Sequence, residues 1–481
     1  MFRKLGSIAF SAGVFLVKGK ILDSKEGSAF LKPNQKSDFL SSRNKGLLLD
    51  GEKSRISVKE SFQNVCIYAR VGIGKTTKYI IPNVLDKAKE NASLVVNDPK
   101  GEVYRSTAGY MRACGFNVVL FNPQDINLSN LFNPLSEARN EIELEQVAEI
   151  LIKAGNPGEK DPYWNNGAIR ILKVLIKCLS FGDRRYFNLP NLTHLLQNFG
   201  NQGEGLEEWI SQNCWDPQFP SDESVYNEWR GALIGSEKTI QTFVGICLTS
   251  LKALGNRDIR AFFSKSDYDL RNLRKKKTVI YFVTPPEHGE YYSFIVSLFF
   301  RSVFNECMRP EHLEGKSLPV YILYDEFGNS FINDFVSVAT TIRGYGVSLS
   351  IVLQSSSQLP MKYGVETSKA IQGGFNTNMC LCAADLVTAD YFSQLCGRVV
   401  EKRTKYERDL VPTREEYNLF NSDAVRTMEE DECLIISKNR HPLRLSMTPF
   451  YMNRKFKKAS IFPLPPVERH QRTITPRLVR L

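Results

Sequence analysis

A glycine-rich turn near residue 70 carries the clearest chemistry in the sequence. Residues 69–76 read Ala-Arg-Val-Gly-Ile-Gly-Lys-Thr, which follows the pattern GxxxxGK[ST] except that Ala69 stands at the first glycine position. Glycines let successive backbone N–H groups point at phosphate oxygens, and the N-terminus of a following helix adds partial positive charge. Alanine is compatible with the first position if its φ is negative. The pattern predicts a phosphate-binding loop, and an incidental strand–helix turn is the alternative.

Each residue type in this loop has an expected role. We expect Lys75 to reach the β- and γ-phosphates and the Thr76 hydroxyl to bind Mg²⁺. The residues expected to contact the nucleotide are Gly72, Ile73, Gly74, Lys75, Thr76 and Thr77. The sequence therefore predicts ATP and Mg²⁺ as cofactors.

A second acidic element is needed beside a phosphate-binding loop, and residues 320–326 supply one. Five apolar or aromatic residues lead directly into Asp325 and Glu326. Asp325 is expected to hold Mg²⁺ through water, and Glu326 to orient and activate the attacking water. A solvated turn at a strand end is the alternative reading of the pair.

Three further polar positions follow or precede apolar runs. Gln354 ends the run 348–353, where it could sense the γ-phosphate or simply cap a strand. Arg343 lies just before that run, and in a ring of subunits it could reach a neighbour's nucleotide as an arginine finger. A surface loop is its alternative. Asp98 begins the stretch 98–102, which either supports the site or forms a turn stabilised by Pro and Gly.

Short apolar runs bounded by turn residues predict the strands that must position these side chains. The expected strands are residues 64–68, 93–98, 116–121, 278–283, 320–324, 348–353 and 378–382. Helical stretches separate the first three, which indicates βαβ units and a parallel sheet.

A long helical stretch interrupts this pattern. Between residues 141 and 263 apolar residues recur at helical spacing, and Asp325 lies 250 residues after Lys75. We therefore predict an α/β fold, a P-loop core with a parallel central sheet and an inserted all-α domain. The expected parts are an N-terminal segment 1–40, a nucleotide-binding domain in two pieces, 41–140 and 271–460, the all-α insertion 141–270, and a basic Pro/Arg-rich tail 461–481.

Composition narrows the class of protein. The chain has 481 residues, of which 42% are hydrophobic, and a formal net charge of +11. Such a composition excludes a disordered or collagen-like chain, and the basic surplus favours nucleic acid, acidic lipid or acidic partners. Ten scattered cysteines without a CxxC predict buried, reduced thiols, and not a disulfide scaffold or zinc module.

The N-terminal apolar stretch and the basic C-terminal stretch each allow more than one interpretation. The apolar stretch 5–17 follows Arg3 and Lys4 but is too short to span a bilayer, which takes around 20 residues. A secretion signal does not suit an ATP site, so we expect an interfacial helix or a segment that packs on its own core. Residues 451–481 hold eight Lys or Arg and one acidic residue, and they predict a flexible tail that touches nucleic acid or acidic lipid, or is merely solvated.

Several ordered segments together resemble one family, the type IV coupling proteins of conjugation and type IV secretion. The matching segments are residues 69–83, 97–102, 161–164, 323–329, 350–359, 376–378 and 388–397. The resemblance implies a RecA-like core carrying an all-α domain, and a homo-hexamer on the cytoplasmic face of the bacterial inner membrane. Typical members carry two transmembrane helices before the core, whereas this sequence has only the stretch 5–17. It is therefore expected to be peripheral or held by a membrane-anchored partner, and cytoplasmic if unanchored.

The resemblance also implies a function and its partners. The chain is expected to be an ATPase that recruits single-stranded DNA with its relaxase, or a secreted protein, to type IV channel components and drives transfer by ATP hydrolysis. One alternative is a double-stranded DNA translocase of the chromosome-partitioning type, which shares the core. Another is a nucleotide-switched substrate receptor with little motor activity, whose helical domain is the working surface.

Overall fold

The chain divides into two compact units in the computed structural model. Unit 1 comprises Met1–Asp86 and Leu349–Lys457, and unit 2 comprises Lys87–Ser348 and Lys458–Leu481. The structure describes residues 16–17, 20–21, 24–156, 159, 161–284, 287, 289–313, 315–383, 385–403, 413–465 and 475–481. Most of the expected apolar segment 5–17 lies outside these residues. No helix within the described ranges has the length and apolar character needed to cross a membrane.

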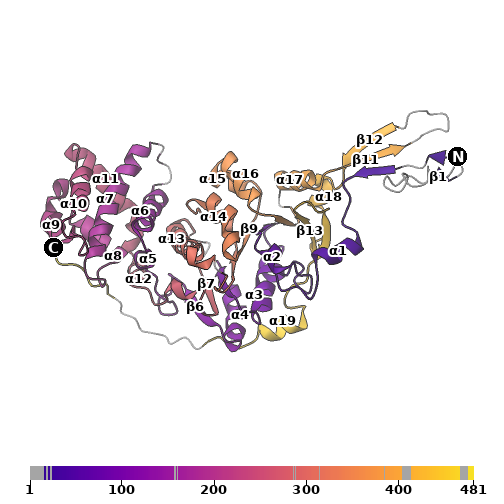
Figure 1. The fold of residues 1–481 in the computed structure, drawn as a ribbon, viewed down its shortest axis with the longest axis horizontal. Helices are drawn as coiled ribbons and strands as arrows, with labels where there is room; N and C mark the ends of the chain where they lie inside the picture. Colours follow the sequence, from indigo (N-terminus) through magenta and orange to yellow (C-terminus); the bar gives the residue numbers. More distant parts are fainter. Residues whose placement is uncertain are drawn as a thin grey trace. The chain divides into compact units, whose positions relative to one another are not determined.

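The main sheet has nine strands in the order β14-β13-β10-β4-β9-β8-β5-β7-β6 (Figure 1). All seven predicted strands are confirmed: β4 (Val65–Ala69), β5 (Ser93–Asn97), β6 (Asn117–Phe121), β7 (Thr278–Phe282), β8 (Val320–Tyr324), β9 (Val347–Leu353) and β10 (Thr377–Leu381). The sequence did not predict β13 (Glu432–Ser437) and β14 (Leu443–Ser446), which extend the sheet in antiparallel fashion from β10. The predicted α/β class with a mostly parallel sheet is confirmed.

In unit 1, β4 lies between β9 and β10 and runs parallel to both. Every residue of β4 is buried, which explains its unbroken apolar sequence. A smaller antiparallel sheet combines β3 (Ser24–Gly27), β11 (Arg398–Arg403) and β12 (Thr413–Asn418), and β1 (Leu16–Val17) pairs with β2 (Lys20–Ile21). The helices here are α1 (Pro33–Phe39), α2 (Val58–Ser61), η1 (Thr76–Ile80), α3 (Ile81–Lys87), α15 (Gln358–Tyr363), α16 (Val365–Gly373), α17 (Leu386–Cys396), α18 (Ser422–Arg426) and α19 (Arg454–Ala459).

In unit 2, β5 lies between β7 and β8, again in parallel, and β6 pairs with β7. The elements around them are α4 (Glu102–Ala113), α5 (Pro134–Glu137), η4 (Leu270–Asn272), α13 (Gly289–Cys307), η6 (Pro310–His312), η7 (Phe327–Asn329), α14 (Phe335–Thr341) and η8 (Ile342–Tyr345). The stretch predicted to be helical forms a helical cluster, with α6 (Glu141–Gly155), α7 (Pro162–Phe181), α8 (Leu189–Gln197), η2 (Asn201–Leu206), α9 (Glu207–Asn213), α10 (Ser224–Ala232), α11 (Glu237–Ser250), η3 (Lys252–Gly255) and α12 (Arg257–Phe262).

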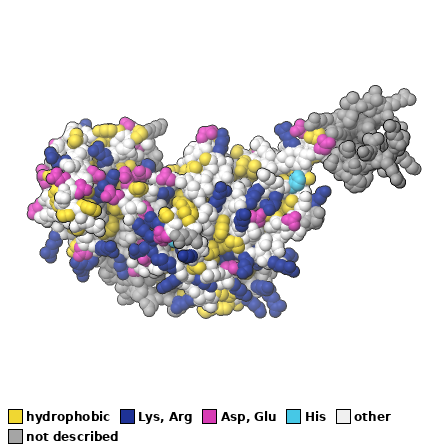
Figure 2. Space-filling model, in the orientation of Figure 1, with side chains coloured by type: hydrophobic (Ala, Val, Ile, Leu, Met, Phe, Trp, Pro, Cys, Tyr) yellow, Lys and Arg dark blue, Asp and Glu magenta, His cyan; other side chains and the backbone are white. Residues whose placement is uncertain are grey.

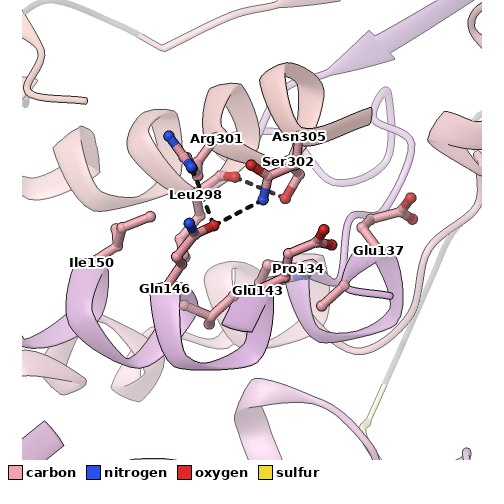
Figure 3. A pocket seen from close by; sticks show the side chains of 11 residues that line it. Pro134, Glu137, Glu143, Gln146, Ile150, Leu298, Arg301, Ser302 and Asn305 are labelled. Carbon is pink, nitrogen blue, oxygen red and sulfur yellow. Dashed lines mark hydrogen bonds between the residues drawn. The ribbon is translucent and has the colours of Figure 1, made fainter. Parts of the chain in front are cut away.

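Polar side chains join the insertion to α13. Gln146 of α6 accepts hydrogen bonds through Oε1 from Arg301 Nε at 3.2 Å and Asn305 Nδ2 at 3.0 Å (Figure 3). They line a cavity of only about 10 Å³, so the contact between the two helices is closely packed. This junction lies wholly within unit 2.

The insertion differs in charge from the rest of the chain. Residues 141–270 contain 18 acidic and 13 basic side chains, a net charge of −5, which leaves +16 for the remaining residues. Figure 2 shows acidic side chains gathered over the helices of the insertion on the face in view. The basic surplus therefore belongs to the α/β part and the ends of the chain.

The last described residues pack on unit 2. Asn191 of α8 donates through Nδ2 to the carbonyl of Arg477 at 3.0 Å and accepts from the N–H of Val479 at 2.8 Å. A Cβ at Gly109 of α4 would lie 2.3 Å from the carbonyl oxygen of Pro463, so the backbone there contacts α4 directly. The described parts of the predicted flexible tail are thus hydrogen-bonded or packed. All ten cysteines are free, as predicted.

Substitution of Phe299 should test the aromatic core of unit 2. This residue is fully buried and stacks on Phe282 with ring centroids 4.4 Å apart. We expect Phe299→Ala to lower the free energy of unfolding by about 3–5 kcal/mol because it leaves a cavity. Urea denaturation measures the change. The matched control is Phe219→Ala, at an exposed position, which should stay within about 0.5 kcal/mol of wild type; equal effects of the two changes would contradict the expectation.

Candidate functional site

The glycine-rich loop has the backbone shape that phosphate binding requires. β4 ends at Ala69, which does not have a positive φ, so alanine fits the first position of the pattern. Gly72 and Gly74 both have a φ of +84°, a conformation that favours glycine. A Cβ at Gly72 would meet no atom within 4 Å, so this part of the loop is open. The helix η1 begins directly after Lys75.

The loop is hydrogen-bonded to itself. Thr77 Oγ1 donates to the carbonyl of Gly74 at 3.0 Å, and the N–H of Lys78 donates to the same oxygen at 2.8 Å. Thr76 is buried and Lys75 is half-buried. The predicted nucleotide-binding residues of this segment therefore lie together on one ordered turn.

The neighbouring strands place Gln354 beside the start of this loop. In the parallel register Leu353 of β9 pairs with Tyr68 of β4, so Gln354 follows where Ala69 ends β4. Its own N–H donates to Gln358 Oε1 at 2.8 Å, and its side chain is half-buried. This position is compatible with both the predicted sensing role and the capping alternative.

In unit 2, the acidic pair follows β8 as predicted. Asp325 is buried and accepts through Oδ1 from the N–H of Glu326 at 2.9 Å. Glu326 has a φ of +56° and accepts through Oε2 from Asn329 Nδ2 at 3.2 Å. A non-glycine residue held at positive φ is strained, and such strain often accompanies functional positions.

Two polar residues at the end of β5 lie beside this pair. Asn97 pairs with Tyr324 in the parallel register, and its Nδ2 donates to the carbonyl of Asp325 at 2.7 Å. The buried Oδ1 of Asn97 has no hydrogen-bond partner among the described residues. Asn97 lies in the matching segment 97–102 but was not named from sequence as a site residue, although a polar residue that ends an apolar strand beside Asp98 was a usable indication.

Asp98 supports this edge of the sheet. Its Oδ2 accepts from the N–H of Tyr104 at 2.8 Å, and the side chain is almost fully buried. Burial raises the pKa of this carboxyl to about 6, with a smaller contribution from the charge of Asp325. Asp98 therefore stabilises the turn, and the charge of Asp325 acts on it, so the position is compatible with both interpretations of this segment.

Arg343 lies apart from these groups in the described structure. It is exposed on η8, ahead of β9, and no hydrogen bond or ion pair joins it to the acidic pair of unit 2. Exposure is what an arginine that acts on another subunit requires, and it equally fits the surface-loop alternative.

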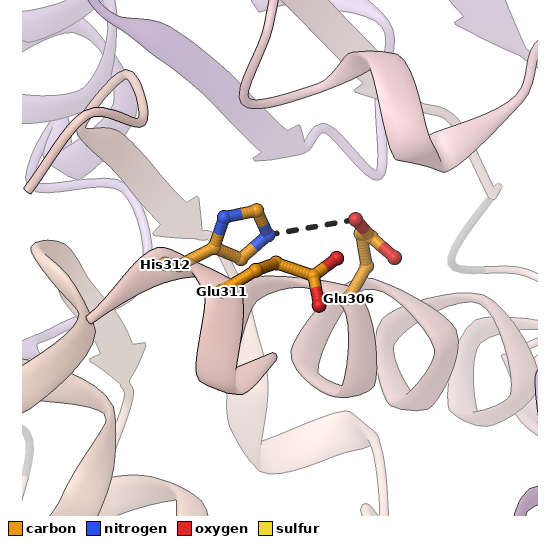
Figure 4. Close-up of side chains that lie close together, drawn as sticks. All are labelled: Glu306, Glu311 and His312. Atoms are coloured by element: carbon orange, nitrogen blue, oxygen red, sulfur yellow. Dashed lines mark ion pairs between the residues drawn. The ribbon is translucent and has the colours of Figure 1, made fainter. Parts of the chain in front are cut away.

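A separate cluster of Glu306, Glu311 and His312 has ligand atoms within 4.8 Å of one another (Figure 4). Arg139 bonds both carboxylates, Glu306 at 2.6 Å and Glu311 at 2.9 Å. Burial lowers the pKa of His312 to about 4. Since a guanidinium already neutralises these carboxylates, the cluster is better explained as part of the packing of α13 than as a metal site.

Comparison with known proteins matches this architecture. The family described as "Type IV secretory system Conjugative DNA transfer" matches residues 25–469. Protein VirD4 of Rhizobium radiobacter is 22% identical over 409 residues, 82% of this chain and 57% of that protein. Conjugal transfer protein TraG of Escherichia coli is 23% identical over 358 residues, 70% of this chain and 55% of that protein. The chain thus spans less than three-fifths of the length of these two curated relatives.

Solved structures share the fold at low sequence identity. The unbound bacterial conjugative coupling protein TrwBdeltaN70 superposes with a TM-score of 0.67 at 15% identity, covering 88% of this chain and 92% of that one. Plasmid coupling protein TrwB in complex with ADP and Mg²⁺ gives a TM-score of 0.65 at 14% identity, covering 88% and 94%. These similarities show that the chain shares the fold of the two proteins.

Asp98 should make stability depend on pH. Its pKa of about 6 in the folded chain exceeds the ordinary value of 3.8, so the folded chain holds the proton more tightly. Stability should therefore fall as pH rises from 4 to 6, by at most about 3 kcal/mol. Asp98→Asn should match wild type near pH 4 and be more stable above pH 6.

Urea denaturation between pH 4 and 8, without nucleotide or metal, measures this difference. The control is Asp423→Asn at an exposed position, which should leave the pH profile unchanged. A profile that is identical in wild type and Asp98→Asn would show that Asp98 ionises normally.

Proposed function

This chain belongs to the family of type IV coupling proteins, and from that premise we propose that it is an ATPase that recruits a substrate to a type IV secretion or conjugation channel and drives its transfer. The observation that carries the proposal is the family match over residues 25–469, which includes both the phosphate-binding loop and the acidic pair.

The residues present suit a magnesium nucleotide. The loop combines two glycines of positive φ, an open face at Gly72 and the half-buried Lys75. The hydroxyl of Thr76 and the carboxylate of Asp325 are oxygen donors of the kind that Mg²⁺ prefers. A homologous fold, TrwB, was solved with ADP and Mg²⁺. The family match spans both segments, and on that ground we propose that the loop and the acidic pair serve the same nucleotide.

Within that assignment each side chain has a defined task. The backbone N–H groups of residues 72–77 and the ammonium of Lys75 bind the phosphates, and Thr76 and Asp325 hold the metal, which neutralises phosphate charge when bound. Glu326 orients the attacking water and accepts its proton. Gln354 contacts the γ-phosphate or the water, and Arg343 stabilises charge in a neighbouring subunit's site.

The charge distribution supports a nucleic-acid substrate for the α/β part. Outside the insertion the chain carries +16, which attracts DNA phosphates whatever the sequence. The insertion is negatively charged and is the less favourable surface for DNA. We propose single-stranded DNA with its relaxase, or a secreted protein, as substrate. We further propose a homo-hexamer at the cytoplasmic face of the inner membrane, peripheral or held by a membrane-anchored partner and in contact with channel components.

Nucleotide turnover tests the proposal directly. We expect Mg²⁺-dependent ATP hydrolysis that rises when single-stranded DNA is added. Glu326→Gln should lower kcat on the order of 100-fold while nucleotide binding is kept, because only water activation is lost. Lys75→Ala should abolish both nucleotide binding and ATP hydrolysis.

The control is Lys53→Ala at an exposed position. The absence of ATP binding by wild type with Mg²⁺ would refute the proposal. Binding without turnover, unaffected by DNA, would favour the nucleotide-switched receptor.

Mixed subunits test Arg343. Arg343→Ala alone and Lys75→Ala alone should each be inactive. In an equal mixture that exchanges subunits, roughly a quarter of the sites would combine an intact loop with an intact neighbouring arginine. Activity should therefore recover to about that fraction of wild type. No recovery, or full activity of Arg343→Ala alone, would exclude an arginine that acts between subunits. The control is Arg398→Ala, at another exposed arginine.

A further inference from the structure

Lys78 is a buried cation directly behind the phosphate-binding loop. It lies in η1, three residues after Lys75, and is only 8% exposed. Burying an ammonium is costly unless it is hydrogen-bonded. The nucleotide-binding residues named above do not include Lys78, so its burial calls for another explanation.

The side chain of Lys78 lies next to Gly74. A Cβ placed on Gly74 would lie 3.5 Å from Cε and 3.7 Å from Cδ of Lys78. The aliphatic part of this side chain therefore packs close to the loop at Gly74. The N–H of Lys78 also donates to the Gly74 carbonyl at 2.8 Å. Lys78 is therefore linked to Gly74 through both its side chain and its backbone, and Gly74 has the positive φ that shapes the loop.

The ammonium group is held by a distant part of unit 1. Lys78 Nζ donates to the backbone carbonyl of Glu430 at 2.6 Å, in the turn that precedes β13. Burial lowers the pKa of Lys78, while the nearby charges of Glu430 and Asp431 oppose that shift. A charged hydrogen bond to a fixed carbonyl is stronger than a neutral one.

Two further contacts join the same region to the loop. Arg70, the first residue after β4, bonds Glu430 Oε1 at 3.4 Å, but both side chains are largely exposed and such pairs contribute little. The N–H of Phe450 donates to the carbonyl of Thr77 at 2.9 Å. Of the two charged side-chain contacts described here, the part-buried bond from Lys78 is shorter and more shielded from solvent than the pair of Arg70 and Glu430.

We propose that Lys78 is a positioning residue that holds the phosphate-binding loop in its binding shape by tethering it to the backbone of Glu430. Lys78 touches no phosphate and acts through Gly74. Its effect on nucleotide affinity rests on the proposed function, whereas its effect on the loop does not. Because the acceptor is a backbone oxygen, the hydrogen bond itself does not require the Glu430 carboxylate, whose charge only favours the protonated ammonium.

Hydrogen exchange of the full chain without nucleotide tests the tether. In Lys78→Met, which keeps the stem but loses the donor, the amides of residues 72–77 should exchange at least about tenfold faster than in wild type. Glu430→Gln keeps the backbone acceptor and should accelerate exchange much less than Lys78→Met, and the control Lys53→Met should exchange like wild type. Unchanged exchange in Lys78→Met, or an equal acceleration in Glu430→Gln, would overturn the proposal. Lys78→Arg keeps a donor and should restore protection, which decides the matter if Lys78→Met does not fold.

Binding of fluorescent ADP with Mg²⁺ tests the consequence for the nucleotide. We expect Lys78→Met to raise Kd about tenfold with kcat at saturation nearly unchanged, because only the preorganisation of the loop is lost. A fall in melting temperature with an unchanged Kd would mean a purely structural residue and overturn the positioning role. If wild type itself binds no nucleotide, the proposed function fails, and the exchange data still decide whether the tether exists.

Discussion

Parallel strand pairing is the constraint on which the remaining structure depends. Neighbouring parallel strands end at the same edge of a sheet. The strand pairing alone therefore brings the short polar segments that follow these strands close together. In unit 1 this pairing places Gln354 beside the loop that follows β4. In unit 2 it places Asn97 and Asp98 beside Asp325. Fully buried apolar strands make the pairing stable, and the loops after them are free to carry polar chemistry.

The insertion is joined to this scaffold by charged and polar side chains, with only a cavity of about 10 Å³ between α6 and α13. Arg309, two residues after α13, pairs with Glu143 of α6 at 2.5 Å, and Arg139, just before the insertion, bonds Glu306 of α13. Both pairs are largely buried, where loss of one partner is costly. Since α13 leads into β8 and thus to Asp325, the insertion and the acidic pair share one helix as support.

The sequence allowed the parallel sheet, the helical stretch and the strand-end positions of the two proposed phosphate-site segments to be predicted, because each depends on local patterns of apolar and glycine residues. It did not reveal the small sheet of β3, β11 and β12, whose strands are rich in charged residues and lack an apolar run. It also missed β13 and β14. The bond from Lys78 to Glu430 joins residues 352 positions apart, and no local pattern encodes such a contact. The same reason explains the division into two units, which depends on long-range contacts.

Each unit is assembled from two separate segments of the chain, since Lys458–Leu481 belongs with Lys87–Ser348 and Leu349–Lys457 with Met1–Asp86. During synthesis, unit 2 cannot acquire its last contacts until Lys458–Leu481 has left the ribosome. The partly formed unit must meanwhile remain unaggregated while more than a hundred further residues of unit 1 are made. Closing such long loops is slow compared with helix formation. The interleaved order of segments therefore makes completion of each unit wait for a segment far along the chain.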